Sequence, residues 1–466
     1  MRPNVACGST PVSSDNSSDL LSSPIPQLVR RLALPAGTGF LFNTMFNVVD
    51  TWYGGKLSTS ALAAMSLSFP VFFIVLAIGS GVSSGATTLI GNALGRKAPD
   101  EAQAYILQAL SFALLHAIAL TVIGLALSPW IFRMMGASGE YLALSLSYMN
   151  VIFAGSAFML LNFVMNAVLN AHGNTRAYRN FLIVGFFLNL LLDPWLMYGG
   201  FGIPALGLPG IALATIAVHC LGNFYLFSQL SASGAMAPFR LGGLRPRWMY
   251  FRELFSMGFP SALNMMTVSL GIFIITWYVG RFGEQAVAAY GIATRIEQIA
   301  LLPVMGLNIS TLALTAQNFG AGRIDRIRET VSVSLRYGCL LAATGSVAAL
   351  LFGRELMGLF TADGTVTEIG VQFLNIEAFV FPAYVLLYIC VSATQGIKMP
   401  LFGLVIGLLR QIAGPLVLFH LLASVMGMGL LGIWWGILGV TWSAALIVVI
   451  YVNHLLKRCQ LEQGAA

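Results

Sequence analysis

Long hydrophobic runs, separated by short stretches of charged residues, glycine and proline, constrain this chain more than any other feature. Each run is long enough to cross a bilayer core as a helix, which takes about 20 apolar residues. Hydrophobic residues make up 58% of the chain and charged residues only 9%, whereas a soluble domain has about 25% charged residues. The runs predict an all-α polytopic membrane protein with twelve transmembrane helices, at residues 32–54, 61–91, 103–129, 141–171, 178–199, 208–231, 252–280, 286–316, 330–352, 367–396, 400–421 and 430–455.

The basic residues between the runs are distributed unevenly across the predicted membrane. One side collects most of them, including Arg30, Arg96, Arg179 and Arg323, while the other side has only Lys56, Arg133, Arg281 and Arg354. Because basic loops remain in the cytoplasm, both termini are predicted to be cytoplasmic and the protein to be a multi-pass protein of the cell (inner) membrane. The net charge of +7 is scattered singly and in pairs, so no nucleic acid partner is expected.

The chain repeats itself at an ungapped offset of 225 residues. Pro35 corresponds to Pro260, and the TWYxG motif at 51–55 recurs at 276–280. Because each copy holds an even number of helices, both enter the membrane from the same side, which predicts two parallel six-helix lobes related by a pseudo-two-fold axis. The expected division is a disordered cytoplasmic tail at 1–27, an N-lobe at 28–231, a cytoplasmic linker at 232–251, a C-lobe at 252–455 and a cytoplasmic tail at 456–466.

The first hydrophobic run carries a polar face that its repeat lacks. Asn43, Asn47 and Asp50 follow i, i+4, i+7 spacing, whereas the corresponding positions in the second copy hold valine and isoleucine. A charged group in the hydrocarbon costs at least about 2.5 kcal/mol, so this face is expected to look into a protein-lined interior. The alternative is an aspartate that reaches the interface from the end of its helix.

Two further runs of the first half place polar groups at a similar depth. Asn189 and Asp193 lie four residues apart in the fifth run. In the sixth run, Thr215 is the first of three polar residues at the same spacing, followed by His219 and Asn223. At 1.5 Å per residue, Asn189, Asp193 and Thr215 can meet Asp50 in the outer half of the membrane. Burial and mutual repulsion disfavour ionising two neighbouring carboxylates together, so one of them can carry a transported proton. Carboxylate, amide and hydroxyl oxygens are also ligands that suit Na⁺. The alternative for Asn189 and Asp193 is a helix cap before Pro194.

Other polar residues within the runs carry weaker predictions. Asn162 and Asn166 are candidates either for lining a cavity or for hydrogen bonding between helices, and His219 is the histidine nearest the proposed site. Glu377 and the pair Arg295/Glu297 are either a charge pair within the second half or a second ion site. The runs contain no HExxH motif, so an enzyme is not expected, nor is a cofactor beyond the coupling ion.

Several ordered motifs between residues 30 and 455 together resemble the multidrug and toxic compound extrusion (MATE) transporters, in particular the DNA-damage-inducible (DinF-like) branch. They are LALP and FNVVDTWYGG in the first run, GNALGRK after the second, LNAHGNTR and LNLLLDP around the fifth, GIALAT in the sixth, RIEQ and QNFGAGR around the eighth, and ATQGIKMPLF after the tenth.

This resemblance implies a twelve-helix antiporter that exports cationic and amphipathic compounds in exchange for H⁺ or Na⁺. It places the coupling site on Asp50, Asn189, Asp193 and Thr215, and a helix kink at Pro35. The acidic second-lobe site of another branch is replaced here by Val268 and Tyr384.

In the predicted cycle, ion binding at Asp50 and Asp193 competes with substrate, the first helix bends at Pro35, and the lobes rock between two orientations. Each chain is expected to contain a whole transport path and to act as a monomer in the lipid bilayer. The alternatives are a flippase for lipid-linked precursors and a dedicated exporter of one metabolite, with the same two lobes. A flippase would require cationic residues inside the first lobe, where the predicted face is acidic.

Overall fold

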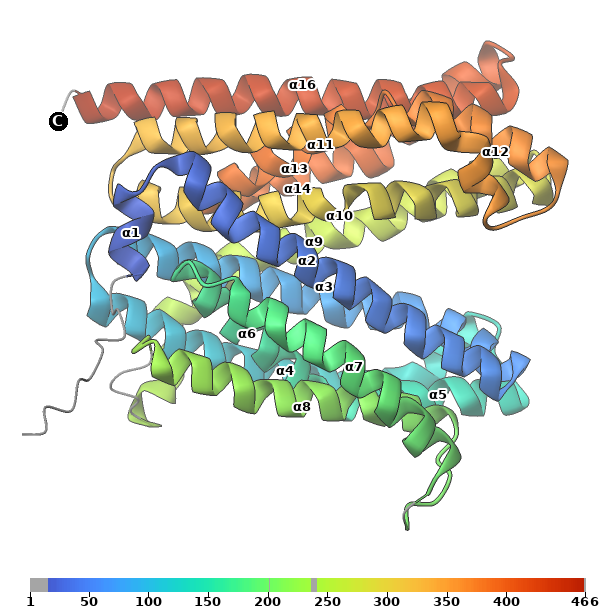
Figure 1. Ribbon diagram of the computed structural model, residues 1–466, viewed down its shortest axis with the longest axis horizontal. Helices are drawn as coiled ribbons and strands as arrows, with labels where there is room; N and C mark the ends of the chain where they lie inside the picture. Colours follow the sequence, from blue (N-terminus) through green and yellow to red (C-terminus); the bar gives the residue numbers. More distant parts are fainter. Residues whose placement is uncertain (1–15, 201, 236–240, 465–466) are drawn as a thin grey trace, which may run out of the picture.

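The computed structural model describes residues 16–200, 202–235 and 241–464 (Figure 1). These residues form helices joined by short turns. Apart from one isolated bridge between Gly200 and Ile203, the described ranges contain no β-structure. The all-α prediction is therefore confirmed.

Ten spans are long and apolar enough to cross a membrane by themselves, and two more are bent helix pairs. The bent pairs are α5 (Gly139–Ala154) with α6 (Ser156–Ala171), at 48°, and α12 (Gly364–Glu377) with α13 (Phe381–Gly396), at 53°. Counting each pair once gives the twelve predicted spans. The other ten spans are α2 (Ile25–Leu57), α3 (Thr59–Gly95), α4 (Pro99–Met134), α7 (Arg176–Tyr198), α8 (Leu208–Ala232), α9 (Trp248–Gly280), α10 (Glu284–Gly320), α11 (Ile324–Gly358), the series α14 (Pro400–Leu408), η2 (Leu409–Ala413), α15 (Gly414–Phe419) and η3 (His420–Val425), and α16 (Gly429–Gly464).

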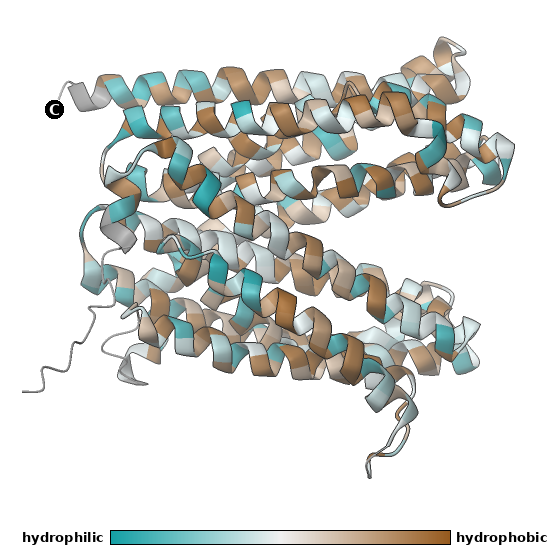
Figure 2. Ribbon diagram, in the orientation of Figure 1, coloured by the Kyte–Doolittle hydropathy of each residue, from teal (hydrophilic) through white to brown (hydrophobic). Residues whose placement is uncertain are grey.

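The spans gather into two bundles. The first six spans, α2 to α8, form the lower bundle in Figure 1, and the later helices α10 to α16 lie above it. Each bundle has its own buried apolar cluster, one built mainly from α3 to α8 and the others mainly from α9 to α16. Hydrophobic residues prevail along the middle of the helices and hydrophilic residues towards their ends (Figure 2). The two-lobe prediction is confirmed.

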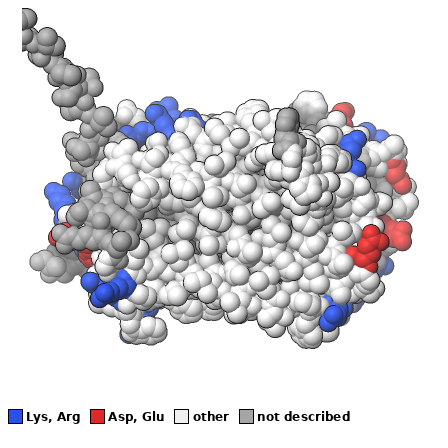
Figure 3. Space-filling view, turned by 90° about the horizontal axis from the view of Figure 1, so that it is seen from below, with Lys and Arg blue, Asp and Glu red and all other residues white. Residues whose placement is uncertain are grey.

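Charged residues lie at the two ends of the molecule and leave a wide uncharged band between them on the face shown in Figure 3. We call the end that carries Arg31, Arg96, Arg179 and Arg326 the basic end, and the opposite one the far end. The uncharged band is the surface that a lipid bilayer would cover.

The two lobes pack against each other in the half of the molecule near the basic end. Glycines allow this close approach: a side chain at Gly95 or Gly320 would overlap the backbone of Gln317 or Asn92 on the facing helix, and one at Gly306 would overlap α2. Between the lobes, Asn92 Nδ2 donates to the Gly396 carbonyl at 3.1 Å and Gln317 Nε2 donates to that of Ala171 at 2.6 Å.

Towards the far end the lobes diverge, as α2 and α10 do in Figure 1. Near the basic end, one face of α2 contacts one face of α10. Further towards the far end, the same two faces become exposed, at Leu41 and Val48 on α2 and at Ile299 on α10. We call the space between these exposed surfaces the inter-lobe opening. The conformation is thus closed at the basic end and open towards the far end.

The predicted disordered tail at 1–27 is wrong for residues 16–27; residues 1–15 lie outside the described part of the chain. Residues Asn16–Ser22 form the short helix α1, and α2 already begins at Ile25. Leu20 is fully buried, because the apolar clusters at the basic end cover it.

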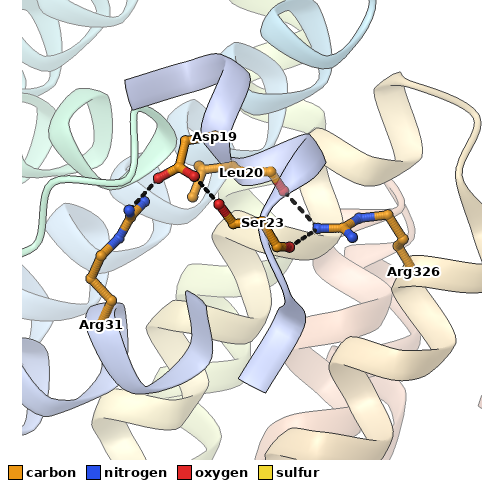
Figure 4. Close-up of polar contacts among 5 residues, drawn as sticks. All are labelled: Asp19, Leu20, Ser23, Arg31 and Arg326. Atoms are coloured by element: carbon orange, nitrogen blue, oxygen red, sulfur yellow. Dashed lines mark hydrogen bonds and ion pairs between the residues drawn. The ribbon is translucent and has the colours of Figure 1, made fainter. Parts of the chain in front are cut away.

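Polar contacts fix α1 to the rest of the basic end (Figure 4). Arg326 at the start of α11 donates to the carbonyls of Leu20 at 3.3 Å and Ser23 at 2.7 Å. Asp19 accepts hydrogen bonds from Ser23 and from Arg31, with which it also forms an ion pair. Leu20 also lies against Gly173 in the turn between α6 and α7. Helix α1 therefore bridges the two lobes.

Two further boundaries differ from the predictions. The linker at 232–251 contains a 3-10 turn at Leu241–Leu244 and the first turn of α9, while residues 236–240 lie outside the described chain. The predicted C-terminal tail at 456–466 is helical as far as Gly464, because α16 continues beyond the apolar segment.

Candidate ion-coupling site

Three helices of the first lobe bring the predicted polar residues together. Asp50 lies on α2, Asn189 and Asp193 on α7, and Thr215 on α8, and all four side chains are buried. The helical spacing explains the arrangement, since Asn189 and Asp193 are one turn apart and present both groups to α2.

Hydrogen bonds join the four side chains into one cluster. Asn189 Nδ2 donates to Asp50 Oδ1 at 2.5 Å and to Asp193 Oδ2 at 2.9 Å. Thr215 Oγ1 lies 3.1 Å from Asp50 Oδ2 and 3.2 Å from the Ile211 carbonyl oxygen, so its hydroxyl can donate to either acceptor. The amide of Asn189 thus connects carboxylates from two helices.

Two buried oxygens of the cluster have no hydrogen-bond partner, namely Asn189 Oδ1 and Asp193 Oδ1. A buried acceptor without a donor is costly, so these oxygens favour either a proton on a carboxyl group or a cation between them. Carboxylate, amide and hydroxyl oxygens are the ligands that hard cations prefer, and the donor set therefore also suits Na⁺ as a transported ion.

The remaining candidates of the first lobe fall into two groups. Asn43 and His219 line a small cavity between α2, α7 and α8, and Asn47 donates to the Asn43 carbonyl at 2.8 Å. Asn162 and Asn166 on α6 are both buried. Asn162 Nδ2 donates to Asn223 Oδ1 on α8 at 2.5 Å. This bond between two helices is of the kind that the sequence analysis gave as the alternative to lining a cavity.

Two tyrosines beside the cluster were missed by the sequence analysis. Tyr148 on α5 is buried within electrostatic range of Asp50 and Asp193. The hydroxyl of Tyr53 donates to the Leu190 carbonyl of α7 at 3.1 Å, which links α2 to α7 beside the site. The position of Tyr53 one turn beyond Asp50 was a usable signal, whereas that of Tyr148 on another helix was not.

Pro35 lies inside α2, which continues as one helix from Ile25 to Leu57. A proline has no backbone N–H, so the usual helical hydrogen bond to the carbonyl of Arg31 is absent. The helix is therefore weakened at the level where it packs against α10, because nearby Gly37 lies against Pro303 of that helix.

The predicted pair Arg295/Glu297 is not formed. The two residues lie on different sides of α10: Arg295 is exposed, while Glu297 faces the interior of the second lobe. The cation within electrostatic range of Glu297 and of buried Glu377 is Arg410, in the π-helical segment η2, whose guanidinium lies 5.1 Å from the ring centre of Tyr384.

Solved structures share the fold of this chain. One titled as MATE in the bent conformation has a TM-score of 0.90 at 22% identity, with 97% of this chain and 99% of the other covered. A MOP superfamily transporter from Pyrococcus furiosus has a TM-score of 0.89 at 21% identity, with 97% and 100% covered. The fold is thus that of two-lobe membrane transporters.

The MatE family matches residues 35–195 and again residues 260–419, once in each lobe and at the offset of the internal repeat. The chain belongs to the MatE family. A relative named "FAD transporter" from Shewanella oneidensis is 28% identical over 403 residues, covering 84% of this chain and 87% of the relative. "Probable multidrug resistance protein YoeA" from Bacillus subtilis is 25% identical, covering 88% and 89%.

Proposed function

We propose that this protein is a secondary active antiporter that exports cationic or amphipathic small molecules in exchange for H⁺ or Na⁺. The observation that carries the proposal is the buried cluster of Asp50, Asn189, Asp193 and Thr215, with its two unpartnered oxygens. Such a cluster changes its charge when an ion binds, and all three helices that hold it belong to one lobe.

The coupling follows from the position of α2. This helix contributes Asp50 to the cluster and also packs against α10 of the other lobe through Gly37. Binding of an ion removes charge repulsion between the two carboxylates and lets α2 pack more closely on α7 and α8. Since Pro35 weakens α2 near its inter-lobe contact, a shift at Asp50 can change how the lobes meet.

The proposed orientation places the basic end and both termini in the cytoplasm, with the protein acting as a monomer in the cell inner membrane. The excess of arginine and lysine at the basic end supports this orientation. The inter-lobe opening then faces outwards, which is the state from which substrate leaves and the coupling ion enters.

A dedicated metabolite exporter is the second candidate, because the relative from Shewanella oneidensis is named an FAD transporter. The flippase alternative has less support, since the cluster in the first lobe is acidic and holds no cationic side chain.

Efflux of ethidium from proteoliposomes under an imposed pH or Na⁺ gradient tests the proposal. We expect efflux driven by one of the gradients in the wild type and its loss in Asp50→Asn. Asp363→Asn is the matched control, because Asp363 is an exposed helix cap at the far end. Gradient-driven efflux by Asp50→Asn at the wild-type rate would refute the assignment of the site.

A further inference from the structure

Arg295 is an exposed cation within a membrane-spanning helix, three turns in from the far end of α10. Arg295 takes part in neither of the ion pairs of Arg31 with Asp19 and of Arg96 with Glu101. An arginine at this depth is costly against lipid and normally faces water, a counter-ion or a ligand. Where its side chain points therefore decides what it does.

The helical phase of α10 answers this question. In its outer half the exposed residues form one stripe, and Arg295 lies at its centre, with Ala288, Gly291 and Ile299 on either side. Eleven residues, or three turns, further along the same stripe lies Gly306, which packs against the backbone of Ala33 and Gly37 on α2. The stripe therefore faces the first lobe, and Arg295 points into the inter-lobe opening.

The exposed neighbours of Arg295 are neutral and include apolar side chains; one turn away on α10 they are Gln298 and Ile299. Ile299, one turn away, is 56% exposed, and on α2 the stripe that continues from Gly37 presents Leu41 at 44% and Val48 at 61% exposed. Glu297 does not neutralise Arg295, because it turns about 160° away around α10 and faces Arg410 and Tyr384. The Arg295 guanidinium thus lies near the exposed apolar side chains of Ile299, Leu41 and Val48, without a neighbouring carboxylate on its own stripe within two turns.

We propose that Arg295 is a substrate-binding residue that holds an anionic oxygen group, a phosphate or a carboxylate, on an amphipathic molecule in the inter-lobe opening. A guanidinium matches such groups with two parallel hydrogen bonds, while Leu41, Val48 and Ile299 receive the apolar part. This inference rests on the proposed function only in taking the inter-lobe opening as the transport path. It widens the substrate class from cations to amphipathic molecules that carry an anion.

The anion can belong to a small-molecule substrate or to a lipid headgroup that enters from the side. Riboflavin and its phosphate ester, FMN, form a suitable pair of probes, because they differ only by the phosphate. Binding of each is measured by flavin fluorescence to the full chain in phosphatidylcholine nanodiscs. No ion gradient is involved, so failure of this test and failure of the antiport test with Asp50→Asn are distinguishable.

We expect the wild type to bind FMN at least about tenfold more tightly than riboflavin, because one hydrogen-bonded pair between a guanidinium and a phosphate contributes an affinity difference of this size. Arg295→Gln is expected to reduce this ratio to about one while riboflavin binding is unchanged, which also shows that the variant is folded. Arg295→Lys is expected to keep part of the preference, and Arg354→Gln, at the far end of α11, to keep all of it. Repeating the titration with phosphatidylglycerol in the nanodiscs separates the sources: competition with FMN indicates a lipid headgroup, and its absence indicates a small molecule.

Two results would overturn the proposal. One is a wild type without preference for FMN over riboflavin in phosphatidylcholine. The other is a preference that survives in Arg295→Gln.

Discussion

The side-chain amide of Asn189 donates one hydrogen bond to Asp50 on α2 at 2.5 Å and another to Asp193 on its own helix at 2.9 Å. Both amide hydrogens are therefore used on carboxylates, and the two acidic groups from different helices are held in one site. Asn189 has no freedom to act as a donor elsewhere. Its carbonyl oxygen, Oδ1, remains unpartnered and available to a cation.

Replacing Asn189 by alanine is expected to uncouple transport. The substitution removes the donor that Asp50 and Asp193 share and an oxygen that suits Na⁺, at a cost of about 1–3 kcal/mol for buried acceptors left without a donor. Gradient-driven efflux is expected to fall at least about tenfold. Asn180→Ala, at an exposed position of the same helix, is the control and should transport like the wild type. Equal rates for both variants would contradict the role of Asn189.

The closed basic end depends on glycines at the crossing of α3 and α10. A Cβ at Gly320 would overlap the carbonyl of Asn92, whereas one at Gly358 of α11 would meet no atom within 4 Å. In an ordinary helix, alanine in place of glycine stabilises by up to about 1 kcal/mol. We therefore expect Gly358→Ala to be neutral or stabilising and Gly320→Ala to separate the lobes at the basic end.

Thiol labelling measures that separation. A cysteine introduced at Ser84, whose hydroxyl donates to Gln395 of the other lobe at 3.1 Å, reports on the inter-lobe contact in a background without other cysteines. Labelling from the basic side is expected to be faster with Gly320→Ala than with Gly358→Ala. Equal labelling rates would show that this crossing does not hold the basic end closed.

Helix α1 is expected to stabilise the same closed state, because it contacts both lobes. Arg326→Met removes the hydrogen bonds to Leu20 and Ser23, and faster labelling at position 84 is the expected result. The control is Arg30→Met, since Arg30 donates within its own helix, to Pro26, and to no other group in the described part of the chain. If both variants are labelled at the wild-type rate, the contacts of Arg326 with α1 do not stabilise the closed state.

The contact between α1 and α2 should be insensitive to pH in the neutral range. Hydrogen bonds from Ser23 and then from Arg31 hold the pKa of Asp19 below its ordinary value of 3.8. A lowered pKa means that the contact contributes its full stability above about pH 4 and loses it only as the pH falls below that. The ratio of the labelling rates at position 84 in Asp19→Asn and in the wild type should therefore be the same at pH 8 and at pH 5.5. A difference within this range would contradict the assignment.

Much of the fold could be predicted because the membrane imposes one strong rule. Hydrophobic length and the 225-residue repeat gave twelve spans in two lobes, and the i, i+4 spacing of Asn189 and Asp193 placed both on the face towards α2. The cluster with Asp50 and Thr215 could be anticipated because polar groups at equal depth in the membrane have few other partners.

Other features depend on tertiary contacts that no local pattern contains. The tail residues 16–22 are polar enough to suggest disorder, yet burial of Leu20 and the hydrogen bonds from Arg326 order them as α1. The short sequence separation of Arg295 and Glu297 suggested a pair, but two residues along a helix turn by about 200°, so they face different surroundings. Arg410, which lies near Glu297 instead, is more than a hundred residues away in the chain.

The most direct test of the central claim is to follow substrate and ion in the same proteoliposomes. Vesicles loaded with ethidium, without an imposed ion gradient, are monitored for dye efflux together with uptake of ²²Na⁺ or of protons, the latter by an internal pH dye. We expect one of the two ions to enter only when substrate leaves, and this linked uptake to disappear in Asp50→Asn but not in Asp363→Asn. Substrate efflux without movement of either ion, or linked uptake that persists in Asp50→Asn, would contradict an antiporter coupled through the Asp50 cluster.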